Sequence, residues 1–312
     1  DELDFRFLKY VLIAEGEALL RFASGSVHQT IYFPEVKSFY IALPPISEQR
    51  AIVDMLGALD DKIELNGRVS ATLEAMAQAI FRDWFVDFGP VRRISSGLTD
   101  AAEIMGGVSS NIDGAGPPSE LFPSSFDSDG IPSGWEMGPL IETLVLQRGF
   151  DLPAPSRTPG PFRVIAASGD NGAHCDFKVE APGVCTGRSG VIGNVFYLDE
   201  NFWPLNTSLW VKEFPNSTPV YAYFILKEQD LERFNSGSAV PTLNRNHVHE
   251  ISIVKPPMKV VRAFDEIATA MFRKIAANQR ESRTLAVTRD YLLPRLMSGR
   301  VRLGGALQET AA

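Results

Sequence analysis

The stretch that decides the fold is "LPPISEQRAIVDMLGALDDKIELN", Leu43 to Asn66. Two consecutive prolines oppose a helix, because their rings clash with the preceding turn and because proline has no backbone N–H to donate. The residues that follow them adopt a helical pattern at once. A second stretch, "VKPPMKVVRAFDEIATAMFRKIAAN" from Val254 to Asn278, is organised in the same way. Each proline pair therefore predicts the end of one structural unit and the start of a long helix.

The two stretches belong to an internal duplication. "RFASGSV" (21–27) corresponds to "RFNSGSA" (233–239) at an offset of 212 residues (233 minus 21), and the same offset continues without a gap to Thr284-Leu285. One spacing kept over so many positions indicates a repeated unit. The second copy extends from about residue 132 to residue 303, whereas the first holds only what corresponds to residue 213 onward. We therefore expect the first copy to be truncated.

Both stretches carry a seven-residue repeat of apolar positions, which predicts two coiled-coil helices. The expected a and d positions extend over 52–84 in the first helix and over 264–296 in the second. Ser47 is suited to cap the first helix, and Gly89-Pro90 to end it. The duplication favours an antiparallel pairing of the two helices.

A polar layer interrupts this apolar seam. Asn66 and Asn278 occupy the same a position, and Ser70 and Ser282 follow at the next d position. Buried polar residues at such positions fix the register of a coiled coil at a cost in stability. An antiparallel pair with a pseudo-twofold axis would place Asn66 opposite Ser282, and Ser70 opposite Asn278. The alternative is that the four residues form an exposed polar stripe.

The pattern changes between the helices. Residues 90–134 are rich in Gly, Ser, Pro and Asp, which predicts a surface linker with one possible short helix over 101–105. From Trp135 onward, short strand-like runs alternate with turns and predict an α+β globular domain, although "VYAYFIL" suits either a strand or a helix. The expected order is a C-terminal remnant of a first globular domain (1–45), the first helix (46–89), the linker (90–134), the second globular domain (135–257), the second helix (258–303) and a tail (304–312).

Two loops of the second globular domain carry side chains that suit contacts with nucleic acid. They are Arg188 and Ser189 in "CTGRSGVIG", and Thr242, Asn244 and Arg245 in "SGSAVPTLNRNHV". Arginine binds guanine O6 and N7 as a bidentate pair, and serine reaches a base edge or a phosphate. The alternatives are a hairpin turn with an exposed arginine for the first loop, and an ordinary polar loop for the second.

Composition and missing motifs argue against an enzyme. A net charge of −8 argues against a protein that coats nucleic acid by charge alone, but leaves room for a small basic face on an acidic body. Cys175 and Cys185 are too few for a disulfide framework, and His174 beside Cys175 has no partner ligands in view. The chain has no phosphate-binding loop, dinucleotide fingerprint or nucleophile elbow. No apolar run is long enough to span a membrane. We therefore expect a non-catalytic, cytoplasmic protein without metal or cofactor.

The motifs around the first helix resemble a known family. "PPISEQRAIVDMLGALDDKIELNGRVSATLEAMAQAIFRDWFVDFGPVR" is similar to the central conserved region of specificity subunits of type I restriction-modification enzymes. "IPSGWEM", "TGRSGVIGNV", "FWPLNTSLWV" and "SGSAVPTLNRNHVHEISIVKPP" fit the same family pattern, so the resemblance covers nearly the whole chain. The second helix departs from the pattern, because it carries Val260-Val261-Arg262 where the first has Glu-Gln-Arg.

The resemblance implies a non-catalytic scaffold that recognises double-stranded DNA in phage defence. In this family, two target-recognition domains each read one half of a split site. Two conserved helices set the distance between the half-sites and dock methyltransferase (M) subunits, which supply S-adenosylmethionine and adenine-N6 chemistry. Restriction (R) subunits add translocation and cleavage. Residues 135–257 are then a target-recognition domain, and its five loop residues become candidate DNA contacts. The rival hypothesis is a duplicated coiled-coil adaptor that binds only proteins.

Overall fold

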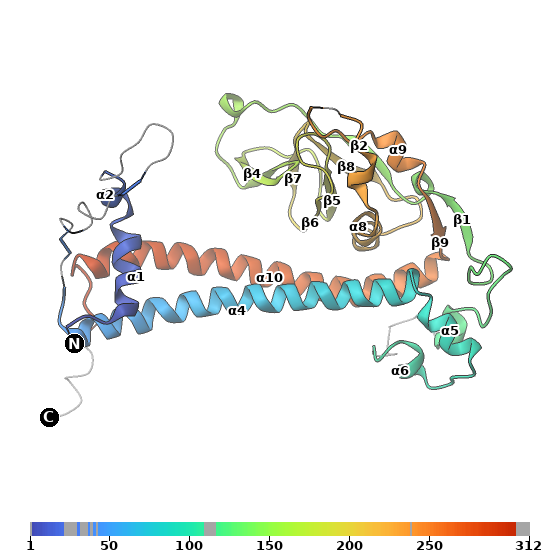
Figure 1. Cartoon of the computed structure of the whole chain (residues 1–312), viewed down its shortest axis with the longest axis horizontal. Coiled ribbons are helices and arrows are strands. Elements are labelled where there is room, and N and C mark those ends of the chain that lie inside the picture. The colour runs from blue at the N-terminus through green and yellow to red at the C-terminus, as the bar shows by residue number, and fades with distance from the viewer. Residues whose placement is uncertain are drawn as a thin grey trace. The chain divides into compact units, whose positions relative to one another are not determined.

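The computed structural model describes residues 2–21, 30–31, 37, 40–41, 43–108, 117–237 and 239–303. The chain divides into two compact units, which are residues 1–72 with 274–312 (unit 1) and residues 73–273 (unit 2). Two long helices, α4 (Ile46–Phe85) and α10 (Met258–Met297), contribute to both units (Figure 1). The expected α+β class with two long helices is confirmed. Among the described residues, no helix is both long and apolar enough to cross a membrane.

The helical pair follows the predicted heptad pattern. Each helix contains 40 residues, and every expected a and d position over 52–84 and 264–296 is buried or half-buried. In α4, the N–H groups of Glu48 and Gln49 donate to the carbonyl of Pro45 over 2.9 and 3.0 Å. The helix therefore begins at Ile46, and the prediction that Ser47 caps it is wrong, because the carbonyl of Pro45 already accepts the first helical bonds.

The end of α4 also differs from the prediction. The helix ends at Phe85, and Phe88 adopts a left-handed backbone with φ of +54°. Gly89 and Pro90 do not end α4. They open the next helix, α5 (Gly89–Ser95), where a proline in the first turn suits the missing donor.

The segment predicted as a surface linker contains three short helices: α5, α6 (Ala101–Ile104) and α7 (Pro118–Leu121). Of these, α6 lies on the expected short helix, and residues 109–116 lie outside the described residues. Apolar residues of the segment join the core of unit 2, and the ring of Phe122 lies 5.1 Å from that of Trp84. The buried members are Val91, Met105, Leu121 and Phe122. Sparse apolar residues among Gly, Ser and Pro therefore anchor the segment.

The described residues of unit 2 form three sheets. A pair joins β1 (Glu136–Pro139) to β9 (Ser252–Lys255), and a four-stranded sheet has the order β2 (Val145–Arg148), β8 (Ser208–Glu213), β5 (Gly183–Gly187), β6 (Val195–Leu198). The third sheet has the order β4 (Gly169–His174), β3 (Phe162–Ala166), β7 (Phe202–Pro204). Short helices connect the strands: η1 (Leu140–Glu142), η2 (Ala154–Ser156), η3 (Leu231–Phe234) and α9 (Arg245–His249).

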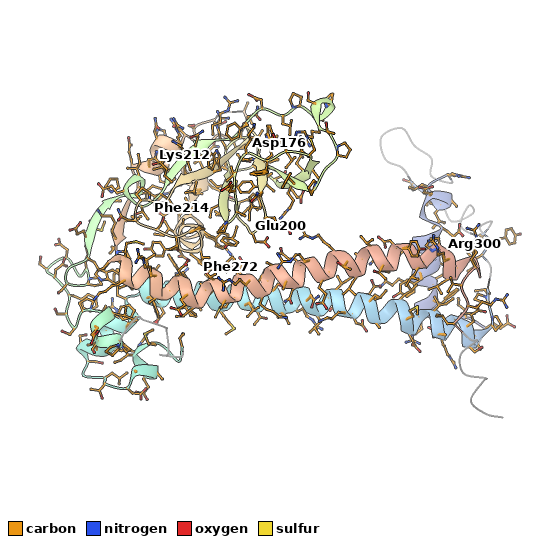
Figure 2. All side chains as sticks on the ribbon, turned by 180° about the vertical axis from the view of Figure 1, so that it is seen from behind. Asp176, Glu200, Lys212, Phe214, Phe272 and Arg300 are labelled. Carbon is orange, nitrogen blue, oxygen red and sulfur yellow. The ribbon has the colours of Figure 1, made fainter. Side chains whose placement is uncertain are left out.

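The stretch "VYAYFIL" forms part of helix α8 (Pro219–Glu228), with Thr218 as its N-cap. All seven residues are buried, because α8 packs against β5 and β6 on one side and against the α4–α10 pair on the other (Figure 1). Phe272 of α10, labelled in Figure 2, lies 4.6 Å from the ring of Tyr197 and 5.5 Å from that of Tyr223. One aromatic core therefore joins the helices to the sheet of unit 2.

Unit 1 has a smaller core. Helix α1 (Phe5–Ala14) buries Phe7, Tyr10 and Val11 against apolar residues of α4 and α10, and α2 (Gly16–Leu20) follows it. Gln49 of α4 fixes the start of α1, because its side chain accepts a hydrogen bond from the N–H of Asp4 and donates to the carbonyls of Glu2 and Pro44.

Candidate nucleic-acid interface

Arg188 directly follows β5, on the connection that leads to β6. Its N–H donates to the carbonyl of Thr207, and its own carbonyl accepts from the N–H of Leu243, both over 2.8 Å. The guanidinium donates to the carbonyl of Asn206 over 3.0 Å, and the residue is half-buried. Gly187 permits this path, since a Cβ there would collide with the backbone oxygen of Val191. Arg188 is therefore held in place, and is not an exposed arginine at a hairpin tip.

The second candidate loop lies against this connection. Ser189 and Thr242 form an antiparallel bridge, and the N–H of Gly190 donates to the carbonyl of Pro241 over 2.9 Å. Within the loop, Asn235 Oδ1 accepts from the N–H groups of Gly237 and Thr242 over 3.0 and 2.9 Å. Two polar loops that are far apart in the sequence thus share one surface.

Four of the five expected DNA contacts line one cavity of about 430 Å³: Arg188, Thr242, Asn244 and Arg245. Leu209 and Leu243, each 1% exposed, also line it, as does Ser236. The fifth expected contact, Ser189, is not among the lining residues, although it pairs with Thr242 beside the cavity. The structure therefore brings most of the expected residues together.

Arg148, at the end of β2, also lines the cavity and was not among the residues expected from the sequence. It lies there because of the strand register, since Arg148 pairs with Leu209 of β8 and Leu209 pairs with Thr186 of β5. The only signal in the sequence is a basic residue before Gly149 at the end of a strand-like run. That signal does not reveal which strand pairs with the one that carries Arg148, and therefore does not place Arg148 at the cavity.

The cavity has a positive lining. Arg148, Arg188 and Arg245 contribute three guanidinium groups, and none of the lining residues is acidic. Asp151 approaches Arg148 at 3.7 Å, but their side chains are 72% and 51% exposed, so the pair is weak. At the end of α9, burial and then the charge of Arg245 lower the pKa of His249, whose Nε2 accepts from the N–H of Leu146 over 2.8 Å. The arrangement suits an anionic ligand.

The four residues of the expected polar layer meet between the helices in unit 1. Asn66 Nδ2 donates to Ser282 Oγ over 3.3 Å, and Asn278 Nδ2 donates to Ser70 Oγ over 3.3 Å. These are the two pairs that a pseudo-twofold axis requires. Asn66 and Asn278 are 3% and 2% exposed, so the layer is not a solvent-facing stripe. Asn66 also donates to Glu281 Oε2 over 2.8 Å, a contact that the repeat does not predict.

The ring of His174 already contacts the backbone of Thr158. Its Nδ1 lies 3.1 Å from both the N and the O of Thr158, and its ring packs against that of Trp203. Within the part of the chain that the structure describes, no three His, Cys, Asp or Glu residues gather in a way that could hold a metal ion.

Comparisons with known proteins agree on one family. The model of the "Type I restriction modification DNA specificity domain" matches residues 1–75 and 158–284. The HindI specificity subunit of Haemophilus influenzae, from a type I restriction enzyme, is 26% identical over 343 residues, covering 89% of this chain and 72% of the relative. The MjaIX specificity subunit of Methanocaldococcus jannaschii is 22% identical, covering 92% of this chain and 66% of the relative.

Among solved structures, the S subunit of a type I restriction-modification system from M. genitalium has a similar fold. The TM-score is 0.56 with 21% sequence identity, and the match covers 95% of this chain and 73% of that chain. At this identity the likeness supports the α+β fold with its long helices.

Proposed function

The chain belongs to the family of type I restriction-modification DNA specificity domains, and on this premise we propose that it reads part of a bipartite DNA target and docks methyltransferase subunits. The globular domain of residues 135–257 acts as the target-recognition domain, in which Arg188, Ser189, Thr242, Asn244 and Arg245 contact the duplex. The observation that carries this assignment is the gathering of four of these residues around one cavity lined by arginine and free of acidic residues.

The helices have a separate role in this proposal. They hold the recognition domain at a set distance from a second half-site and present a surface to the M subunits, through which R subunits join the complex. The polar layer of Asn66, Ser70, Asn278 and Ser282 fixes the register on which that distance depends. The chain itself is non-catalytic and acts in the cytoplasm, where the cell's DNA lies.

Sequence recognition is tested with the full chain and a pool of random DNA duplexes. Bound duplexes are recovered, amplified and sequenced over successive rounds. We expect one motif to be enriched, since base contacts in a groove discriminate by about 1–3 kcal/mol for each good pair. A folded chain that enriches no motif, yet binds other proteins, would support the coiled-coil adaptor instead.

Docking of M subunits is tested in the source cell by mapping N6-methyladenine with and without the gene. We expect deletion to remove methylation from every copy of one motif, and the motif to contain the sequence selected in vitro. Unchanged methylation at all sites contradicts the proposal.

A further inference from the structure

The three arginines of the cavity form a positively charged cluster. The proposed recognition of DNA does not by itself say which part of the duplex this cluster binds. Guanidinium groups that share a small recess repel one another, and an anion among them removes that repulsion. Asp151 reaches only Arg148, through a long and exposed ion pair, and also accepts a hydrogen bond from Asn206. The cluster is therefore built to receive a negative charge from outside the domain.

The shape of the site determines which part of a duplex fits. Base edges lie on the floor of a groove about 8.5 Å deep, so a side chain that reads them must protrude from the protein. A recess receives the parts of DNA that project outward, which are the backbone phosphates and their sugars. Arg188 is half-buried and already donates to the carbonyl of Asn206, so it does not extend as a free fork toward a guanine.

We propose that this cavity, bordered by Arg148, Arg188 and Arg245, binds one backbone phosphodiester of duplex DNA. This inference rests on the proposed function and deepens it, because it assigns to these arginines the positioning of the duplex and leaves base reading to other side chains.

The side chains that border the cavity have different roles in binding the phosphate. Arg188 is the fixed donor, held through both its backbone and its side chain. Arg148 and Arg245 are the more exposed pair, and approach the phosphate from the end of β2 and from the start of α9. Asn244 uses its Oδ1 to cap α9 by accepting from the N–H of Asn246, so its amide NH₂ is the group that faces an anion.

The assignment has a measurable signature. A phosphate contact carries no sequence information, so its loss weakens all duplexes alike. Each neutralised phosphate also adds about 0.9 to the slope of log affinity against log salt. A base contact behaves in the opposite way, because its loss weakens the selected sequence more than a scrambled one.

The experiment uses the full chain, a duplex selected by the wild type and a scrambled duplex of equal length and composition. Fluorescence anisotropy measures both affinities between about 50 and 200 mM salt. For Arg148→Gln and Arg245→Gln, we expect both duplexes to weaken by the same factor, about tenfold, and the salt slope to fall, by no more than the roughly 0.9 that one phosphate contributes. Arg148→Lys keeps the charge and should keep the slope. Arg262→Gln, an exposed residue of α10 outside the cavity, is the matched control and should change nothing.

A second arm locates the phosphate. Methylphosphonates, which carry no charge, replace the phosphates of the selected duplex one at a time. We expect one position at which the wild type loses affinity and Arg148→Gln loses less, because Arg188 and Arg245 still face that phosphate. Unchanged slopes, or a loss confined to the selected duplex, would overturn the phosphate assignment. A wild type that binds both duplexes equally would refute sequence recognition, and the scrambled duplex would still test the cavity.

Discussion

Gln49 explains why the two copies of the duplication differ at the helix start. Its side chain is 0% exposed and makes three hydrogen bonds, to the N–H of Asp4 and to the carbonyls of Glu2 and Pro44. The corresponding residue of the second copy is Val261, which is also 0% exposed but lies in an apolar core. A buried polar group is retained only where partners exist. The Glu-Gln-Arg marker is therefore present in the copy where its glutamine joins the start of α1 to that of α4.

Replacing Gln49 by leucine tests this role. The change leaves the N–H of Asp4 and two carbonyls without their partners, so we expect a loss of about 1–3 kcal/mol in the free energy of unfolding. Denaturant unfolding followed by circular dichroism measures it. Arg50→Leu, at the exposed neighbouring position, should stay within about 0.5 kcal/mol of the wild type. Equal effects of the two changes would contradict the role given to Gln49.

His249 predicts a pH dependence of unit 2. Burial, and then the charge of Arg245, lower its pKa below the ordinary 6.5, and the neutral ring accepts from the N–H of Leu146. The unfolded chain therefore binds the proton more readily, so stability is complete above about pH 6.5 and falls as the pH drops through the folded pKa. Denaturant midpoints measured across this range should decline less in His249→Gln, which keeps an acceptor but does not titrate. Parallel declines would exclude His249 as the cause.

Part of the arginine-lined cavity is predictable from single residues of the sequence. Arg188, Thr242, Asn244 and Arg245 stand out because glycine, proline and small polar neighbours mark their segments as loops. Arg148 does not stand out, because it reaches the cavity through the pairing of β2 with β8, and sequence periodicity does not specify strand partners. Ser189 has the right chemistry, but the bridge to Thr242 places it beside the cavity.

At the scale of elements, the long helices follow the heptad pattern because a repeat over many turns averages out local exceptions. Their ends depend on single hydrogen bonds. Pro45 supplies the first acceptor, so α4 begins at the expected Ile46 and Ser47 is not its cap, and the left-handed Phe88 separates α4 from α5. The segment 90–134 reads as a linker by composition, yet a few apolar side chains fix it to the core.

The polar layer is symmetric in sequence but not in its contacts. Asn66 Nδ2 lies within hydrogen-bonding distance of Glu281, Ser282 and the carbonyl of Asn278, whereas Asn278 Nδ2 bonds to Ser70. Because each net hydrogen bond contributes about 0.5–1.5 kcal/mol, we expect Asn66→Ala to destabilise unit 1 more than Asn278→Ala. Thermal unfolding of the two variants beside the wild type measures the difference. Equal losses would mean that the Glu281 contact contributes nothing.

At the scale of the whole molecule, the long helices are also part of the core of unit 2. Phe81, Trp84 and Phe85 of α4 and Phe264 of α10 belong to the same buried cluster as residues 220–226 of α8 and Leu209 of β8. A spacer that only held two bodies apart would not need this shared core. We therefore expect the geometry of the proposed DNA-contact loops to depend on side chains of α4 and α10.

Phe264→Ala tests that dependence. Phe264 is 0% exposed and contacts the rings of Phe81 and Phe85 at 5.6 and 5.4 Å, so the change should cost about 3–5 kcal/mol. We expect it to expose the amides of β5 and β8 to hydrogen exchange and to abolish duplex binding. Leu56→Ala is the matched control, since Leu56 is also 0% exposed but belongs to the core of unit 1. It should lower stability by about 2–5 kcal/mol and leave duplex affinity unchanged. Loss of binding in both variants, or protected strands in Phe264→Ala, would mean that the helix ends do not support the proposed DNA-contact loops.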